Sequence, residues 1–316
     1  MSQMIRFGDS EITSTGAFLV GELEKLDRRE YAPIADFTWG RDLDLRTDVT
    51  IADEATSFIL TNYAGGFGGT SVGAKSWITG RDTTPAQVAV GATKVLTPVT
   101  PWGMEVSYSI IELQKAMQVG RPIDVQKYNA MKYKFELDTD AQAYIGDEEI
   151  GTKGLLNNDS VVAPVNMGAI DYEKVTPAQI IALFNEALNE AWKQMNYVRI
   201  PNRVLVPPKL FAFLSGTQLP NTPKSLLQFV LENNLARDNG VFLEIHPVKW
   251  LADESVFATP RIVAYIKDES YVRLPRVELQ ALPVQYRDFM QAVPYLGALG
   301  GVEFVRPESV FYGVLA

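Results

Sequence analysis

The side chains that could carry out catalysis are few and lie far apart in this sequence. There is one histidine, His246, and no cysteine. A cysteine–histidine pair is therefore impossible, and a serine–histidine–aspartate triad would have to use that one imidazole. Its neighbours Glu244 and Lys249 complete no recognisable motif, so an ordinary structural histidine is the better interpretation. Zinc sites built on His or Cys clusters are excluded by the same count.

Carboxylate pairs are the remaining candidates for acid–base chemistry or for binding a metal ion. Asp138 and Asp140 lie two residues apart on a predicted helix. Side chains at that spacing point about 200° apart, so the two cannot share an ion. Asp42 and Asp44 fall in an extended segment and could face the same way. A solvated strand explains this one Asp-x-Asp better than an ion site does.

Residues 68–76, GGTSVGAKS, come nearest to a phosphate-binding loop. That motif needs Gly-Lys-Ser/Thr in direct succession, so that lysine and hydroxyl reach phosphate and magnesium together, and Ala74 breaks it. The sequence therefore predicts no catalytic residues, no cofactor and no metal ion. A carboxylate-dependent hydrolase, such as a glycosidase with a pair of Asp or Glu residues, is the weakest alternative.

Composition indicates a globular chain that does not bind nucleic acid by neutralising its phosphates. The 316 residues are 47% hydrophobic and 21% charged, which suits one large domain or two ordinary ones. The formal net charge is −9, whereas proteins that neutralise phosphates present a basic face. The N-terminus has no secretory apolar region, and no apolar run approaches the roughly 18 residues that span a bilayer. We expect a protein made in a cytoplasm, with no membrane partner.

A long helix is the clearest element. Residues 123–145 contain no Gly or Pro, and Pro122 suits a first helical turn. At about 1.5 Å per residue the helix is on the order of 33 Å long, and it ends in a glycine-punctuated turn before residue 158. Acids at 147–149 follow this end, where the helix dipole disfavours negative charge. Their placement indicates a basic partner, either Lys153 or an arginine of a neighbouring molecule, or else a plain surface cluster.

The apolar residues of this helix fall on two faces. One face carries Ala130, Tyr133, Leu137, Ala141 and Tyr144, and the other carries Tyr128, Met131 and Phe135. A surface helix of a monomer needs one buried stripe. The second face therefore needs a further cover, which another subunit or a crossing loop could supply. A helix buried inside one domain is the alternative interpretation.

Residues 55–100 have the most unusual composition. Two strand candidates, 56–63 and 88–102, flank a glycine-rich segment. That segment is roughly 20 residues long, whereas hairpin loops usually have two to five. Within one monomer such a loop is disordered, functional or packed on something outside the subunit.

The remaining elements mix helices and strands without a regular βαβ rhythm, which favours an α+β fold. Residues 176–196 form a capped helix, because Thr176, Pro177 and Gln179 make a capping box with proline at the first helical position. The other predicted segments are helices at 16–33, 104–120 and 222–234, a strand, turn and helix at 203–216, and strands at 241–252, 261–275 and 277–316.

These pieces, in this order, resemble the major capsid protein of tailed bacteriophages, which has the Hong Kong 97 type fold shared with encapsulins. FLVGELEKLDRREY, residues 18–31, is similar to the family's F-L-x-x-E-L-x-x-[IL]-D-x-x-x-Y pattern. Residues 106–130 resemble its Y-S-x-x-E-[IL] helix, glycine and entry into the spine helix. Residues 143–158 resemble the exit from the spine helix, which leads to G-L-L-N. Beyond residue 160 the resemblance rests on element order alone.

The resemblance implies an α+β phage capsid fold of four parts. These are an N-terminal arm at 1–54, an extended β-hairpin loop at 55–103, a peripheral domain at 104–160 that contains the spine helix and is completed by strands within about 265–300, and an axial domain at 161–264 rejoined by 301–316.

It also implies a structural protein, not an enzyme, that assembles into hexamers and pentamers of an icosahedral shell around double-stranded DNA. The expected partners are copies of itself, a portal and decoration or scaffolding proteins. DNA would lie nearby without specific binding, and the protein would reside in the virion. An encapsulin-type nanocompartment shell is the alternative. The expected intersubunit contacts are Phe67, Lys75, Trp77, Arg81, Tyr128, Met131 and Phe135.

Overall fold

The computed structural model describes residues 34, 36–65, 88–119, 123–219, 223–253 and 256–315. The chain divides into two units, Met1–Asp36 and Phe37–Ala316. All helices and strands that the structure describes belong to the second unit. Among those helices, none has both the length and the apolar character needed to cross a membrane.

Helices and strands alternate irregularly along the chain, as an α+β fold requires. The helices are α3 (Trp39–Asp42), α4 (Ile110–Val119), α5 (Ile123–Tyr144), α6 (Pro177–Gln194), α7 (Pro208–Gly216), α8 (Leu226–Glu232) and α9 (Leu235–Asp238), with 3₁₀ turns η1 (Lys249–Ala252) and η2 (Pro307–Ser309). The strands are β1 (Asp44–Arg46), β2 (Ala55–Gly65), β3 (Val88–Ser109), β4 (Val165–Asn166), β5 (Arg203–Val206), β6 (Glu244–Pro247), β7 (Arg261–Tyr265), β8 (Val272–Ala281), β9 (Gln285–Arg287), β10 (Met290–Gly300), β11 (Glu303–Phe304) and β12 (Val310–Val314).

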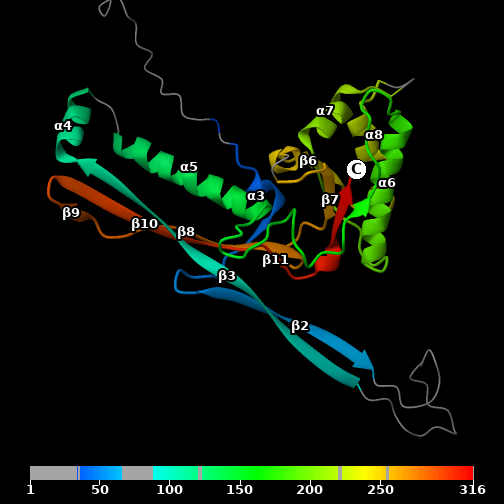
Figure 1. Ribbon diagram of the computed structural model, residues 1–316, viewed down its shortest axis with the longest axis horizontal. Helices are drawn as coiled ribbons and strands as arrows, with labels where there is room; N and C mark the ends of the chain where they lie inside the picture. The colour runs from blue at the N-terminus through cyan, green and yellow to red at the C-terminus, as the bar shows by residue number, and fades with distance from the viewer. Residues whose placement is uncertain are drawn as a thin grey trace, which may run out of the picture. The chain divides into compact units, whose positions relative to one another are not determined.

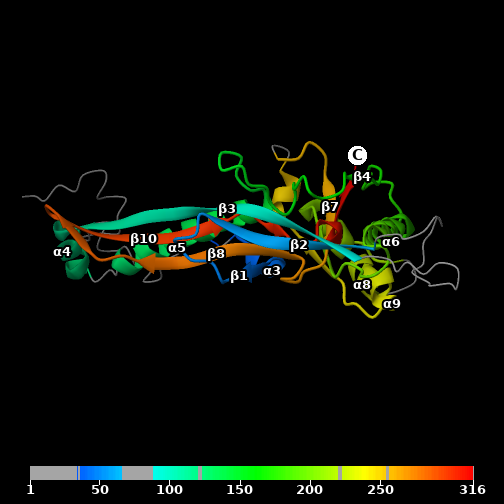
Figure 2. The same ribbon diagram turned by 90° about the horizontal axis from the view of Figure 1, so that it is seen from below.

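The first sheet has seven strands, five of them in the order β1-β8-β10-β3-β2, with β11 beside β8 and β9 beside β10. Strand β3 changes partners halfway along: residues 99–109 pair with β10, and residues 88–98 pair with β2. Figures 1 and 2 show that β3 continues beyond the end of β10, where it is paired with β2 alone. We call β2 and residues 88–98 of β3 the arm. It is a two-stranded ribbon with no third strand among the described residues.

The second sheet has the order β4-β12-β7-β5-β6 and is covered on both faces. Val204 and Val206 of β5 lie in a core with α6, α7 and α8. Leu205, between them, lies in a different core with Tyr144 at the end of α5 and Leu274 of β8. Because alternate residues of a strand point to opposite faces, one sheet serves two cores. The second of these cores joins the two sheets.

Helix α5 lies along the first sheet, and both of its apolar faces are covered within the subunit over its C-terminal half (Figure 1). On the sheet side Phe135 contacts Trp102 of β3, with ring centroids 4.9 Å apart. On the other side the Phe37 ring lies 6.4 Å from the Tyr133 ring and is tilted by 59° to it, and the Tyr144 hydroxyl donates to Asp42. The second cover is therefore the crossing segment of residues 37–43. Over this half of α5 both covers thus come from the same subunit, as expected for a crossing segment or a helix buried inside one domain, and no second subunit is needed there.

The turn after α5 can be made only with glycine at two positions. Gly146 has φ +80°, and a Cβ there would lie 2.4 Å from the Thr152 carbonyl oxygen. A Cβ on Gly154 would lie 2.2 Å from the carbonyl carbon of Tyr144. Backbone hydrogen bonds from Leu155 to Ala143 and from Leu156 to Tyr144 hold the returning chain against the helix end. The chain can pass this close only because neither glycine has a side chain.

Most predicted elements are present, and two predictions need correction. The long helix, the capped helix and both flanking strands of the glycine-rich segment are confirmed. Residues 104–109 were expected to begin a helix but continue β3, because Val106 and Tyr108 alternate into a small core with Met131. The helix predicted for 222–234 is split into α8 and α9. The helix expected at 16–33 lies outside the described residues.

Candidate assembly surfaces and the buried charge network

The arm carries four exposed apolar side chains on one of its two faces. The antiparallel register places Ile59 opposite Lys94 and Tyr63 opposite Val90. Directly opposed residues share a face, and so do residues two apart along a strand. The exposed fractions are 68% for Ile59, 80% for Tyr63, 63% for Val90 and 61% for Leu96. We call these four residues the arm stripe.

A second group of exposed apolar side chains lies where β3 passes into α4. The backbone N–H of Ile110 donates to the carbonyl oxygen of Phe289 at 3.0 Å, which joins the start of α4 to the turn between β9 and β10. Asp288 in that turn has φ +52°, a strained value for a residue other than glycine. Its neighbour Phe289 is largely exposed. The α4 patch comprises Ile110, Ile111, Met117, Tyr286, Phe289 and Met290.

The predicted intersubunit residues fall into three groups. Phe67, Lys75, Trp77 and Arg81 lie outside the described residues. Tyr128 on α5 is 39% exposed, and its ring lies 5.6 Å from that of Tyr295.

Met131 and Phe135 are corrected by the structure. They are 2% and 0% exposed, because the first sheet of the same subunit covers them. The sequence gives the apolar face of a helix but not the molecule that covers it. These two residues therefore leave the set of candidate contacts.

A network of buried carboxylates holds the crossing segment in place. Asp42 is fully buried, at 0% exposure. It accepts hydrogen bonds from Arg41, from the Tyr144 hydroxyl and from Arg203 of β5, the last at 3.1 Å. Burial, together with the Asp42 carboxylate, raises the pKa of Tyr144 far above its ordinary value. The hydroxyl of Tyr265 on β7 donates to the Asp42 carbonyl oxygen at 2.6 Å. One acid thus connects the crossing segment, the long helix and the second sheet.

Asp140 on α5 anchors the same segment from the other side. Its carboxylate accepts the backbone N–H groups of Thr38 at 2.6 Å and Trp39 at 3.0 Å, and the indole N–H of Trp250 at 2.8 Å. Asp138, two residues earlier, accepts instead from the indole of Trp102 at 2.9 Å. The two acids point in different directions, as the helical spacing requires. Among the described residues, no group of three or more His, Cys, Asp or Glu could hold a metal ion.

The guanidinium of Arg276 on β8 lies between two aromatic rings. It is 4.5 Å from the centre of the Trp39 ring and 4.6 Å from that of Phe135. It also donates to Glu136 at 2.6 Å. Nearby, Glu303 is buried and accepts from Arg46 and Arg273. Sequence reasoning missed these acids because nothing in a local pattern marks a buried charge whose partner lies far along the chain.

His246 occupies a structural position. Its Nε2 lies 3.2 Å from a carboxylate oxygen of Glu244, which also accepts from Arg203. Burial lowers the pKa of this histidine despite the acidic neighbour. A hydroxyl or thiol nucleophile is not among its hydrogen-bond partners within the described part of the chain. Asp44 pairs with Lys267 at 3.6 Å while Asp42 faces Arg203, so the Asp-x-Asp pair does not converge.

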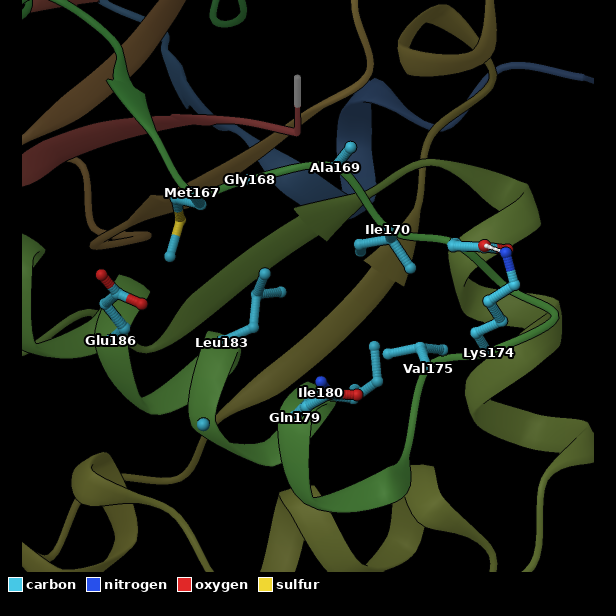
Figure 3. A pocket seen from close by; sticks show the side chains of 12 residues that line it. Met167, Gly168, Ala169, Ile170, Lys174, Val175, Gln179, Ile180, Leu183 and Glu186 are labelled. Carbon is cyan, nitrogen blue, oxygen red and sulfur yellow. Dashed lines mark ion pairs between the residues drawn. The ribbon is translucent and has the colours of Figure 1, made fainter.

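A shallow cavity of about 340 Å³ lies between residues 167–175 and α6 (Figure 3). Its walls are mainly alkyl side chains, including Met167 and Leu183. Its lysine, Lys174, pairs with Asp171 at 3.3 Å. The described residues that line it include no hydroxyl, thiol or imidazole group. This lining offers no arrangement for nucleophilic catalysis.

Comparison with known proteins identifies the family of the chain. Residues 73–313 match the family model described as major capsid protein. A search of curated protein sequences found no match. A chain from the capsid of Myoviridae phage XM1 has a similar fold, with a TM-score of 0.76 and 16% identity, covering 95% of this chain and 99% of that one. A chain from the capsid of cyanophage Pam1 has a TM-score of 0.55 and 12% identity, with 96% and 99% covered.

A third structure, a chain from the capsid of a native GTA particle, has a TM-score of 0.56 and 11% identity, covering 94% of this chain and 96% of that one. At these identities the structural likeness shows the fold alone. The family model, in contrast, matches well over half of the chain. The chain therefore belongs to the major capsid protein family and is a structural component of a capsid shell.

Proposed function

We propose that this protein assembles into hexamers and pentamers of an icosahedral shell that encloses double-stranded DNA. The observation that carries the proposal, beyond family membership, is the arm. An isolated two-stranded ribbon is at best marginally stable in water. This one also exposes Ile59, Tyr63, Val90 and Leu96 along a single face. Burial against a second copy would stabilise both the ribbon and the contact.

The mechanism is geometric. Subunits in hexamers and pentamers meet at slightly different angles, so the same surfaces must bury area in slightly different environments. A ribbon joined to the body through one continuous strand, β3, can bend to absorb the difference, whereas the cores around α5 and the second sheet stay fixed. The α4 patch supplies a second apolar surface for contact between copies. Contacts of this kind are heterologous, and they form closed rings when the rotation between copies closes.

The charge of the chain suits a container wall. A net charge of −9 repels a polyanion, so the shell would enclose DNA without binding it tightly. The other partners we propose are a portal and decoration or scaffolding proteins, with the protein made in the host cytoplasm and residing in the virion. We propose no enzymatic activity. An encapsulin-type compartment is not favoured, because the matched family is that of major capsid proteins.

We further propose the domain division that the sequence suggested. The arm belongs to the extended loop of residues 55–103. The peripheral domain comprises 104–160 and strands within about 265–300, and the axial domain comprises 161–264 and 301–316. The composition of the second sheet supports this division, because β4 to β7 are joined there by β12 from the C-terminal segment. We assign residues 1–54 to a separate part, the N-terminal arm, which is distinct from the arm formed by β2 and β3.

Replacing residues 64–92 with an Asn-Gly turn tests the role of the arm. We expect a folded subunit that forms no shells in negative-stain images, because the loop is gone while every core residue remains. Ile59→Asp should also abolish shells, since it places a charge in the arm stripe. The matched control is Thr93→Asp, which lies on the opposite face of the ribbon and should assemble normally. Full-sized particles from the deletion variant would overturn the proposal.

A further inference from the structure

A cavity of about 420 Å³ lies between α6 and the junction of α8 with α9, which are neighbours in Figure 2. Apart from Leu235, the residues that line it carry an amide or a carboxylate; they are Asn185, Asn189, Asn233, Asn234 and Asp238. Four asparagines from different elements thus meet at one cavity. A side-chain amide offers both donors and acceptors, so the lining can bind a ligand that is itself both.

Several of these polar groups are not used within the subunit. Among the described residues, the side chains of Asn189 and Asp238 make no hydrogen bond or ion pair. Asn185 accepts the backbone N–H of Leu235 through its Oδ1 at 3.3 Å, and its NH₂ group has no partner in the same part of the chain. These donors and acceptors remain available to a ligand.

A second cavity, of about 330 Å³, lies on the same face of α6 toward its C-terminal end. Asn185, Asn189 and Trp192 follow the spacing i, i+4, i+7, which places them on one face of the helix. The first two line the first cavity, and Trp192 lines the second. Asp238 and Asn239, which are adjacent in the chain, likewise line one cavity each. The two cavities are therefore neighbours, and an elongated ligand can span both.

An aromatic pair forms one wall of the second cavity. The rings of Trp192 and Tyr197 lie 5.1 Å apart at an angle of 87°. Asn196 and Tyr197 have φ values of +52° and +62°. Asparagine in this conformation is an ordinary helix cap, whereas an aromatic residue there is strained, and such strain is concentrated at functional sites. Tyr197 is nevertheless 55% exposed, so its ring can contact a ligand.

Charge and size restrict the class of ligand. The charged residues that line the two cavities, within the described part of the chain, are Asp238 and Arg199, whose charges cancel. Binding of nucleic acid through its phosphates needs several cations. Calcium takes about six to eight oxygen ligands at about 2.3–2.6 Å, so a lone ion would not fill volumes of this size, which instead match small-molecule sites of about 300–1,000 Å³. The lining therefore suits a neutral ligand with many hydroxyl groups and an apolar face.

We propose that this face of α6 binds a neutral oligosaccharide. The asparagine amides contact its hydroxyl groups, and the aromatic pair of Trp192 and Tyr197 contacts the C–H faces of its rings. A neutral peptide fits less well, because its backbone offers one donor and one acceptor per residue, whereas each sugar unit offers several hydroxyl groups. This binding is an activity beyond shell formation and does not require assembly.

An array of neutral hexose and N-acetylhexosamine oligosaccharides, probed with fluorescently labelled, unassembled full-length subunit, tests the proposal. We expect binding to at least one of these sugars, whose Kd is then measured by isothermal titration calorimetry. Asn189→Ala should raise that Kd by about fivefold, because hydrogen bonds to the sugar are lost. Tyr197→Gly should raise it by about tenfold, since it removes the ring at a backbone conformation that glycine adopts freely. The matched control is Asn129→Ala, an exposed asparagine on α5, which should leave the Kd unchanged.

Three results would overturn the proposal. They are binding to none of the sugars, an unchanged Kd in both variants, and capture of a neutral Ser/Gly peptide in preference to every sugar, which would assign the site to a peptide. Asn189 is exposed and makes no side-chain hydrogen bond within the described residues, so its replacement leaves the fold intact, as circular dichroism would verify. Because the subunit is tested unassembled, these results do not depend on whether shells form.

Discussion

Truncating Phe135 to alanine separates a core residue from an intersubunit contact. Its side chain is fully buried on the sheet side of α5, against Trp102 and the guanidinium of Arg276. A buried residue contributes to the stability of the lone subunit, whereas a contact residue contributes only after assembly. Phe135→Ala should therefore lower the free energy of unfolding of the unassembled subunit.

The expected loss is large. Replacing a buried phenylalanine by alanine usually costs about 3–5 kcal/mol, because transfer free energy is lost and a cavity remains. The cation–π contact with Arg276 adds about 1–2 kcal/mol where water is excluded. Among the residues that the structure describes, the Nε of Arg276 has no hydrogen-bond partner, so the ring supplies part of the environment of that cation. We expect a total of about 4–7 kcal/mol, which is a large share of the stability of an ordinary domain.

Urea denaturation of dilute, unassembled subunit measures this loss. The matched control is Tyr128→Ala on the same helix, at 39% exposure, which should cost less than about 1 kcal/mol in the subunit. If Phe135→Ala costs less than about 1 kcal/mol at an unchanged m-value, the side chain is not in the subunit's core. Phe135 would then act through contacts in the assembled shell, and our assignment of it to the core of the subunit would be wrong.

Three other perturbations have equally specific outcomes. Gly154→Ala should prevent stable folding, as judged by circular dichroism, because its Cβ would lie 2.2 Å from the backbone of α5, whereas Gly151→Ala meets nothing within 4 Å and should cost about 1 kcal/mol from its positive φ alone. Asp42→Asn should cost about 2–3 kcal/mol in urea denaturation, because it removes the charged acceptor of Tyr144 and leaves Arg203 with Glu244 as its remaining carboxylate partner; a cost below about 1 kcal/mol would contradict the network. Burial raises the pKa of three core tyrosines, Tyr144, Tyr265 and Tyr312. They ionise near pH 10 in the unfolded chain but only at higher pH in the folded one, so their contribution is complete below pH 10 and is lost as the pH rises, by up to about 1.4 kcal/mol per pH unit for each. Tyr312→Phe should reduce that slope by about a third, and an unchanged slope would refute the assignment.

Local signals determined the elements. The span of α5 follows from an uninterrupted run of helix-compatible residues after Pro122, and α6 begins where Thr176 and Gln179 form the capping box, as the structure confirms. The strands of the arm follow from β-branched and aromatic residues around the glycine-rich segment. The arm stripe was also within reach of the sequence, because Ile59 and Tyr63 lie four residues apart on one strand, but choosing the exposed face needs the register with β3.

Tertiary structure decided what covers each face. The sequence showed that α5 has two apolar sides, but only the fold shows what covers each. Residues 37–43 of the same chain cover the side of Tyr133 and Tyr144, and the first sheet buries Met131 and Phe135. It likewise decided that residues 104–109 continue β3, since pairing with β10 outweighs local helical spacing. The buried acids illustrate the reason. Asp42 meets Arg203, 161 residues away in the chain. A local sequence pattern records the periodicity of one segment, whereas burial depends on which distant segment packs against it.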